Sequence, residues 1–432
     1  MIAYRADWIL GSTDPPIRNG SLVVDGNRIV SGGTGEIPQG VEQVAHPGCA
    51  IIPGFVNAHA HLELTLFRDL LHDLSFPDWI RRLTRLKYDK CTREALSASA
   101  RLGAIEMLQA GVTTVGEVMD IPTGWEAMLE FGLQGVAYQE VFGPAQSTAA
   151  EALRGLKEKV ERHRKQETST QRIGLSPHAP FSVSPALYEG VRDLARRDGL
   201  RMTAHIAESA DETSFVRDGA GPFAEAHRKR GIEVVARGCS PVAHLDRLGL
   251  LGPDMLLVHA IETDSQDHEW IRKRGAFVVH CPKSNAYLEH RVAPVAAMRS
   301  RGVPVALGTD SLASNDRFDM FAEMRMVVEQ QQLGCEDAFR MATIEGARAL
   351  GLEKELGSLE AGKRADFSVV GLGNSAGDPI EEIVLNATLV DIQKTFLGGR
   401  EVDVEAEELH KEILRIQLKL KENGIQSSVP HN

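Results

Sequence analysis

Two histidines one residue apart, His59 and His61, follow a short apolar run in the segment IIPGFVNAHAHLELT. The run Ala50–Val56 predicts a β-strand. Side chains alternate between the two faces of a strand, so both imidazoles are expected to point the same way. Two neutral imidazoles that converge at a strand end suit a divalent metal such as zinc or iron. The same spacing also arises by chance on half-buried strands, so the metal hypothesis depends on ligands from elsewhere in the chain.

Further polar residues stand at or just past the ends of other apolar runs. Strands are predicted at Ile173–Ser176, Met202–His205, Met255–His259, Ala276–His280 and Val303–Leu307. The polar residues at or beyond their ends are, in the same order, His178, His205, His259, His280 and Asp310. Of the 15 histidines, six therefore lie at a strand end, which a random distribution over the surface would not produce.

Four of these residues, His59, His61, His205 and Asp310, would make a metal site of three imidazoles and one carboxylate. Such a site leaves one coordination position open for water. The metal would lower the pKa of that water toward neutrality and supply a hydroxide nucleophile. Two plainer interpretations stay open from the residues alone. His205 could be a core histidine with satisfied hydrogen bonds, and Asp310 could be the N-cap of a following helix.

Four other residues have predicted roles around this site. Glu208 lies three residues past His205 and is predicted to take the proton of the water and pass it to a leaving group. The alternative is a carboxylate in the first turn of a helix, stabilised by the helix dipole. His259 is predicted to hydrogen-bond the attacking water or the developing tetrahedral centre. His178, in a loop that prolines stiffen, and His280 are predicted substrate contacts, although His280 could instead form only a tight strand end.

The predicted strands alternate with helical stretches. Two more strands are predicted at Val112–Val115 and Gln134–Tyr138. Helices are predicted at Ala95–Ala110, Ala149–Lys165, Pro185–Arg197, Gln266–Arg274, Pro294–Arg301, Arg317–Gln331 and Glu336–Leu350. This alternation implies parallel strands with crossover helices, and about eight strands close a (β/α)₈ barrel of the TIM type. Active sites of such barrels lie at the C-terminal ends of the strands, where the polar residues above are predicted to meet.

Both ends of the chain are β-like. An Asp25–Gly26–Asn27 turn joins strands at Ser21–Val24 and Arg28–Val30, which predicts a hairpin. Two later strands are predicted at Phe367–Val370 and Leu389–Phe396. We expect residues 1–52 and 359–403 to form a small β-sandwich, residues 53–358 the barrel, and residues 404–432 a charged helix, Val404–Lys421, with a frayed tail ending in SSVPHN.

The bulk properties exclude several classes of protein. The chain has 432 residues, with 43% hydrophobic and 25% charged residues, which is typical of globular proteins. A net charge of −12 argues against nucleic acid or an anionic membrane as a partner. No apolar run approaches the roughly 20 residues that span a bilayer, and MIAYRADWILG lacks the pattern of a signal peptide. The five cysteines form no CxxC pair, so a reducing, cytoplasmic setting is expected.

The chain resembles the amidohydrolase superfamily, and within it the aminohydrolases that act on nucleobases and related heterocycles. The matching segments are PGFVNAHAHLE, SPHAP, TAHIAES, LLVHA, HCPKSN, LGTDS, ATIEGARALGL and GSLEAGKRADF, and they cover nearly the whole chain. The resemblance implies a barrel with a β-sandwich from both termini. It implies one zinc or iron ion on His59, His61, His205 and Asp310. It also implies that Glu208 shuttles protons and that His259 contacts water and substrate. The chain has no lysine in a recognisable context after the fourth strand, which argues against the binuclear hydrolases.

The resemblance implies hydrolytic deamination of an adenine-type nucleoside. Glu63, two residues past His61, is similar to a feature of the aminodeoxyfutalosine deaminases, so aminodeoxyfutalosine is the first expected substrate. The alternatives are S-adenosylhomocysteine, methylthioadenosine, guanine or a chlorotriazine on the same scaffold. Glu63 and Arg68 are predicted substrate contacts, and a salt bridge between them is the other interpretation. Arg68 and the basic residues Arg81, Arg82 and Arg85 are placed in a loop or lid.

Two other classes of function are compatible with the same residues. The first is a hydrolase that expels a different group, such as chloride. The second is a barrel that has kept its metal but lost catalysis, against which the complete set of ligands and Glu208 argues. That last protein would bind a ligand or partner instead. For the deaminase we expect a small-molecule heterocyclic substrate, one divalent metal ion and a homodimer.

Overall fold

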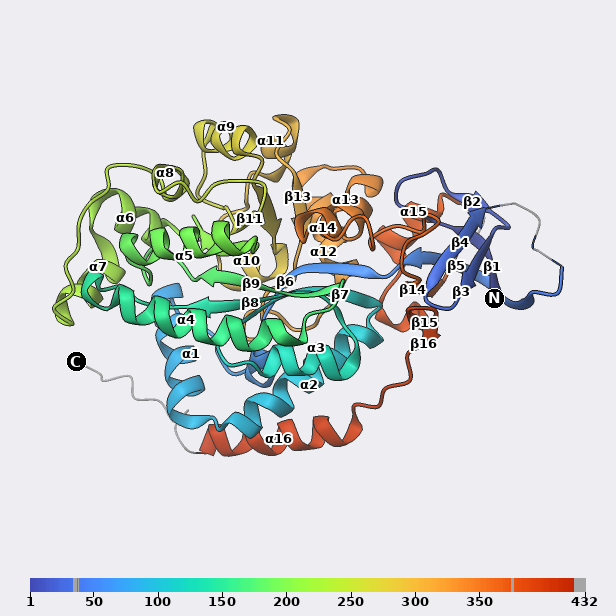
Figure 1. Cartoon of the computed structure of the whole chain (residues 1–432), viewed down its shortest axis with the longest axis horizontal. Helices are drawn as coiled ribbons and strands as arrows, with labels where there is room; N and C mark the ends of the chain where they lie inside the picture. Colours follow the sequence, from blue (N-terminus) through green and yellow to red (C-terminus); the bar gives the residue numbers. More distant parts are fainter. Residues whose placement is uncertain (34–36, 38, 374–376, 423–432) are drawn as a thin grey trace.

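The computed structural model describes residues 1–33, 37, 39–373 and 377–422. A barrel forms the larger part of the molecule, and a sheet built from both chain ends lies beside it (Figure 1). The predicted frayed end SSVPHN lies outside the described residues. None of the helices within the described ranges is long and apolar enough to cross a membrane.

The barrel contains eight parallel strands, each hydrogen-bonded to the next in chain order. They are β6 (Phe55–Ala60), β7 (Val112–Met119), β8 (Gln134–Val141), β9 (Gln171–Pro177), β10 (Met202–Ile206), β11 (Met255–His259), β12 (Phe277–His280) and β13 (Val305–Leu307). The ring is completed past β13, where the N–H groups of Thr309 and Asp310 donate to the carbonyl oxygen of His59 at 3.2 and 3.0 Å. The predicted (β/α)₈ barrel is confirmed.

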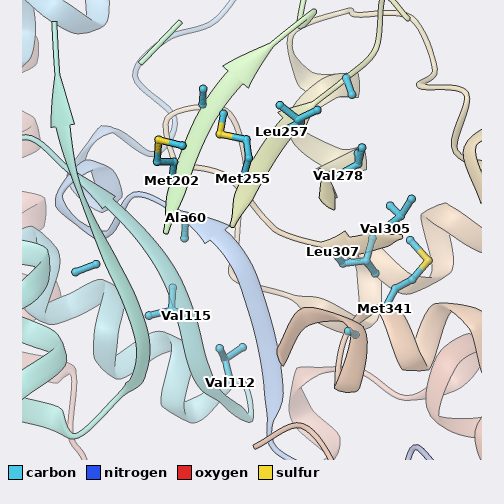
Figure 2. Packing of buried hydrophobic residues seen from close by; sticks show 14 of the residues in the cluster. Ala60, Val112, Val115, Met202, Met255, Leu257, Val278, Val305, Leu307 and Met341 are labelled. Atoms are coloured by element: carbon cyan, nitrogen blue, oxygen red, sulfur yellow. The ribbon is translucent and has the colours of Figure 1, made fainter. Parts of the chain in front are cut away.

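The strands form because their sequences suit burial on both faces. Every residue of β7, β8 and β11 is buried, and β11 (MLLVH) has a continuous apolar run, as is usual in parallel sheets covered by helices. Side chains such as Val112, Met255 and Leu307 belong to the cluster shown in Figure 2. The connecting helices include α2 (Arg93–Gln109), α4 (Ala149–His163), α5 (Pro185–Asp198), α9 (Ser265–Arg274), α11 (Val295–Ser300) and α12 (Met320–Gln331).

The two chain ends form one sheet of eight strands, ordered β16-β15-β14-β5-β1-β3-β4, with β2 paired to β1. Its strands are β1 (Ile2–Ile9), β2 (Ile17–Arg18), β3 (Ser21–Asp25), β4 (Arg28–Gly33), β5 (Glu42–Pro53), β14 (Phe367–Gly371), β15 (Ile392–Leu397) and β16 (Arg400–Glu401). Hydrogen bonds therefore join the strands of the expected sandwich into one continuous sheet. Tyr4, Phe367 and Phe396 pack in its apolar cluster, which draws residues from both ends of the chain. The hairpin is confirmed by the Asp25–Arg28 pair of β3 and β4.

The strand predicted at Ala50–Val56 is wrong as a single element. The chain leaves the terminal sheet at Pro53, the end of β5, and enters the barrel at Phe55, the start of β6. Gly54 lies between them, with its N–H bonded to the carbonyl of Asp366 at 3.1 Å. His59 consequently lies on β6 itself, and only His61 follows the strand.

Three other predicted elements differ from the structure. The prediction of a strand at Leu389–Phe396 is wrong for its first three residues, because Thr388 and Asp391 form a capping box around a 3₁₀ turn before β15 begins. The helix predicted at Glu336–Leu350 is two helices, α13 (Cys335–Met341) and α14 (Ile344–Ala349). The predicted loop with Arg81, Arg82 and Arg85 is a helix, α1 (Phe76–Lys90), with Pro77 in its first turn.

The C-terminal helix α16 (Glu407–Glu422) lies along α2 at the edge of the barrel (Figure 1). His410 Nε2 is 2.9 Å from Glu106 on α2. Gln417 donates to the backbone oxygen of Leu66 at 2.8 Å, in η1 (Leu62–Phe67), the 3₁₀ segment that follows His61. The last described helix thus supports the segment directly after the first two predicted ligands.

Gly308 makes the closure of the barrel possible. A Cβ atom at this position would lie 2.9 Å from both the backbone N and the backbone O of His59. The backbones at Gly308 and His59 cannot move apart far enough to fit this atom without breaking the hydrogen bonds that close the ring. We therefore expect Gly308→Ala to lower the free energy of unfolding by about 2 kcal/mol and to reduce bound metal. Chemical denaturation and elemental analysis measure both.

Gly155 of α4 provides a matched control, because a Cβ there meets nothing within 4 Å. Gly155→Ala should raise the free energy of unfolding by up to about 1 kcal/mol, since alanine favours a helix interior. A Gly308→Ala protein as stable and as rich in metal as the wild type would contradict the proposed dependence of the site on close approach of the two strands.

Candidate metal centre and active site

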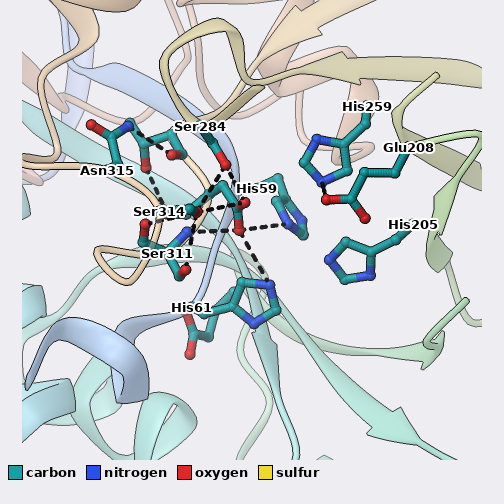
Figure 3. Close-up of polar contacts among 12 residues, drawn as sticks. His59, His61, His205, Glu208, His259, Ser284, Ser311, Ser314 and Asn315 are labelled. Carbon is teal, nitrogen blue, oxygen red and sulfur yellow. Dashed lines mark hydrogen bonds and ion pairs between the residues drawn. The ribbon is translucent and has the colours of Figure 1, made fainter. Parts of the chain in front are cut away.

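The barrel brings His59, His61, His205 and Asp310 together at the C-terminal ends of its strands. The Nε2 atoms of His59 and His61 each lie 3.6 Å from Oδ1 of Asp310. The ring centroids of His59 and His61 are 4.9 Å apart, and the ring of His205 on β10 lies 5.0 Å from that of His59. In Figure 3 the imidazoles of His59, His61 and His205 gather around one centre. The structure therefore places all four predicted ligands in one cluster.

The protonation states in the cluster fit a bound divalent cation. Both ring nitrogens of His59 are buried and have no hydrogen-bond partner in the described part of the chain. Burial lowers the pKa of His59 and His61, and lowers that of His205 to about 4. The rings are thus neutral near pH 7, the form that binds metals. Unpaired imidazole nitrogens beside a carboxylate are a donor set for Zn²⁺ or Fe²⁺.

Asp310 is fixed by bonds to the segment after it and to α10 (Pro282–Tyr287). The hydroxyls of Ser284 and Ser314 donate to its Oδ2 at 2.6 and 3.1 Å, and the N–H of Ser311 donates to Oδ1 at 2.7 Å. Burial opposes its ionisation, but the surrounding histidines hold the pKa of Asp310 well below its usual value. It is not a helix N-cap, because the next helix, α12, is capped by Asp319.

Glu208 and His259 form the second part of the site. Glu208 precedes Ser209, the N-cap of α6 (Ala210–Asp218), so it does not lie in the first turn of a helix. Its backbone is held by the buried carboxylate of Glu212, which accepts the N–H groups of Ala207 and Glu208 at 2.7 and 3.0 Å. His259 Nε2 lies 3.5 Å from Glu208 Oε1 (Figure 3). Two buried, opposed groups of this kind can hold and move a proton.

Three residues at the C-terminal ends of the barrel strands have a strained backbone. Ala207, His259 and Asp310 all have positive φ angles, of 51°, 71° and 60°. Residues with a side chain rarely adopt this conformation, which costs of order 1 kcal/mol or more at each position. The surrounding hydrogen bonds hold these residues in conformations that direct their side chains.

His178 and His280, the predicted substrate contacts, lie on either side of this cluster. His178 bonds through Nδ1 to Ser182 Oγ at 2.6 Å, and its ring is 4.9 Å from that of His205. His280 is fully buried, and burial lowers its pKa to about 3. Its Nδ1 lies 3.5 Å from the amide nitrogen of Asn285. Contact with substrate stays a prediction for both residues.

Glu63 and Arg68 do not pair with each other. The buried Glu63 carboxylate accepts a bond of 2.5 Å from Lys87 on α1. Arg68 pairs instead with Glu106 on α2, next to α16. The alternative interpretation of a Glu63–Arg68 salt bridge is therefore wrong. Arg68 is therefore not among the proposed substrate contacts. Glu63 lies two residues past His61, and its carboxylate is bonded to Lys87.

Three residues near the site were not predicted. Glu140 is the second-last residue of β8, and its carboxylate oxygen lies within 4.8 Å of ring nitrogens of His178 and His205. Burial raises the pKa of Glu140 to about 8. The rule of polar residues at strand ends would have found it, had the predicted strand continued past Tyr138. Lys87 is one of several charged residues of α1, and the sequence does not show that it is buried. His290 lies in a loop after α10, with Nε2 3.8 Å from Glu208 Oε1, and no strand end marks it.

The lowered histidine pKa values predict the pH dependence of metal binding. Three histidines with an ordinary pKa near 6.5 would weaken zinc binding roughly a thousandfold between about pH 7.5 and 5.5, because each would have to lose a proton. Here burial lowers the pKa of all three rings, so fewer of them carry a proton at about pH 5.5 and we expect the Kd to rise by far less, on the order of tenfold. Competition with a chromophoric chelator measures it, with circular dichroism to confirm that the protein stays folded. A roughly thousandfold change would contradict the lowered pKa values, whereas failure to bind zinc at about pH 7.5 would contradict the assignment of these rings as ligands.

Comparison with known proteins agrees with this geometry. Residues 50–402 match the model of the amidohydrolase family. The 5-methylthioadenosine/S-adenosylhomocysteine deaminase of Syntrophobacter fumaroxidans is 32% identical over 82% of this chain and 80% of its own.

Two solved structures share the fold. The adenosine deaminase of Xanthomonas campestris with bound zinc has a TM-score of 0.84 and 24% identity, over 98% of both chains. The aminofutalosine deaminase of Helicobacter pylori in complex with methylthio-coformycin has a TM-score of 0.83 and 23% identity, over 93% of this chain and 100% of its own. Since the family model matches most of this chain and the Syntrophobacter relative is similar along most of both sequences, the chain belongs to the amidohydrolase family.

Proposed function

We propose that this protein is a metal-dependent hydrolytic deaminase of adenosine derivatives. The observation that carries the proposal is the position of Glu208, a buried carboxylate next to His259 and beside a cluster of neutral imidazoles with Asp310. Deamination needs a group that first accepts a proton from the attacking water. The same group then gives that proton to the ring nitrogen beside the carbon that bears the amine. Glu208 is the carboxylate placed to do both.

His59, His61, His205 and Asp310 would hold the metal ion. When bound, Zn²⁺ or Fe²⁺ lowers the pKa of a water toward neutrality. Glu208 accepts the proton of the attacking water and gives it to the ring nitrogen beside the carbon that bears the amine. His259 hydrogen-bonds the water and orients it. Addition of water and loss of ammonia convert the exocyclic amine to a carbonyl.

The substrate class follows from the relatives and from the residues beside the site. The Syntrophobacter relative is named for methylthioadenosine and S-adenosylhomocysteine, and the Helicobacter structure is of an aminofutalosine deaminase. These compounds share an adenine nucleoside that carries a substituent at the 5′ position. We propose that class for this protein, with aminodeoxyfutalosine first because of Glu63 in HAHLE. His178 and Glu140, at the ends of β9 and β8, would face the sugar or the ring.

A panel of substrates tests this proposal. The zinc-loaded enzyme is expected to release ammonia from one or more of aminodeoxyfutalosine, methylthioadenosine, S-adenosylhomocysteine and adenosine, followed by the loss of absorbance that accompanies adenine deamination. Guanine and a chlorotriazine complete the panel. Turnover of guanine alone, or chloride release from the triazine with no adenine-type turnover, would contradict the proposed class.

Glu208→Gln separates proton transfer from metal binding. Glutamine keeps the size of the side chain but cannot accept a proton, so we expect kcat to fall by at least about a thousandfold. Metal content should stay unchanged, because Glu208 is not among the proposed ligands. His61→Asn is the matched variant and should lose metal and activity together. A Glu208→Gln enzyme with near wild-type kcat would remove Glu208 from the mechanism.

A further inference from the structure

Glu208 Oε1 is approached by two imidazoles rather than one. His259 Nε2 lies 3.5 Å away, on the side of the metal cluster. His290 Nε2 lies 3.8 Å away and comes from the loop between α10 and α11. A carboxylate that must accept a proton needs a donor that holds it in its charged form and in one orientation.

His259 has other partners in the site. Its Nδ1 lies 2.9 Å from Oδ1 of Asn285. The amide oxygen of Asn285 faces Nδ1 of His259, and its amide nitrogen faces Nδ1 of His280 at 3.5 Å. An amide oxygen only accepts, so Nδ1 of His259 donates to Asn285. In the proposed function, Nε2 of His259 is the nitrogen that hydrogen-bonds the attacking water.

His290 offers a ring nitrogen that no other described residue uses. Its Nε2 is buried and has no hydrogen-bond partner among the residues that the structure describes. Glu208 is the acceptor it faces. Burial disfavours the charged carboxylate, but His259 and His290 outweigh burial, and the pKa of Glu208 lies below its ordinary value. Hydrogen bonds of catalytic groups are often long before substrate binds, so the distance of 3.8 Å between His290 and Glu208 can shorten in the substrate complex.

The position of His290 is fixed by an aromatic cluster formed by Phe76, Phe181 and Phe223. The His290 ring meets the Phe76 ring at 4.9 Å in an edge-on contact. Phe76 begins α1 and packs against Phe181 and Phe223, which are stacked on each other at 4.0 Å. The imidazole is therefore held by packing, with its Nε2 directed at Glu208.

We propose that His290 is a positioning residue for Glu208, whose Nε2–H holds the carboxylate in the orientation that receives the proton of the attacking water. This inference rests on the proposed function, in which Glu208 transfers that proton. It assigns to His290 no contact with substrate or metal. The loop after α10 and the aromatic cluster thereby become part of the catalytic apparatus.

Two substitutions test the donor. His290→Leu removes the N–H and should lower kcat roughly 30- to 100-fold, with KM changed by less than about threefold. His290→Gln places an amide N–H at a similar reach and should recover kcat to within about fivefold of wild type. His268→Leu is the matched control, since His268 is a buried histidine on the outer helix α9, bonded to Thr263. It should leave kcat unchanged. Metal content is measured for all variants.

Equal losses in His290→Leu and His290→Gln, or unchanged kcat in His290→Leu, would overturn the proposal, because neither fits a donor. A second measurement needs no substrate. In crystal structures of the zinc-loaded variants, we expect the Glu208 carboxylate to move by about 1 Å or more in His290→Leu and to stay in place in His290→Gln. An unmoved carboxylate in His290→Leu would also overturn the inference. Failure of the proposed function appears separately, as a wild-type enzyme that deaminates no adenine nucleoside.

Discussion

The carbonyl oxygen of His59 holds the first and last strands of the barrel together. It accepts the N–H groups of Thr309 and Asp310. The side chain of Asn57, also on β6, adds two further hydrogen bonds to Thr309. One backbone junction therefore closes the ring and places the Asp310 carboxylate against the imidazoles of His59 and His61. The glycine at position 308 is required because the two backbones approach too closely for a side chain. Architecture and candidate metal centre depend on the same two hydrogen bonds.

Burial then divides the titratable groups into two kinds. Desolvation keeps the imidazoles neutral, which prepares them to bind a cation. Asp310 and Glu208 are as buried but stay ionised, because serine hydroxyls, a backbone N–H and imidazoles surround them. Glu212 and Glu140 are buried with less compensation, and burial raises the pKa of each to about 8. Glu212 orients the backbone of Glu208 by accepting two N–H groups. Each carboxyl group thus has a protonation state set by its neighbours.

Much of this arrangement could be predicted from the sequence. The strands are apolar runs, and parallel strands place their C-terminal ends at one edge, so polar residues past those ends must meet. That reasoning found His205, His259 and Asp310. It missed Glu140 only because the predicted strand was too short. It could not find His290, since a loop residue acquires its neighbours from tertiary packing. The division of Ala50–Val56 between two sheets was equally hidden, because a continuous apolar run does not show where its hydrogen-bond partners change.

The distance along the chain between the residues that meet has a consequence for biosynthesis. His59 and Asp310 are about 250 residues apart, and the ring closes only when the last barrel strand pairs beside the first. Contacts between such distant residues form late, because a long loop must be ordered before they give any stability. A ribosome that has made two thirds of the chain has therefore made most of the strands but no complete cation site. A product that stops before Asp310 would lack one of the four proposed ligands and would be unable to assemble the centre.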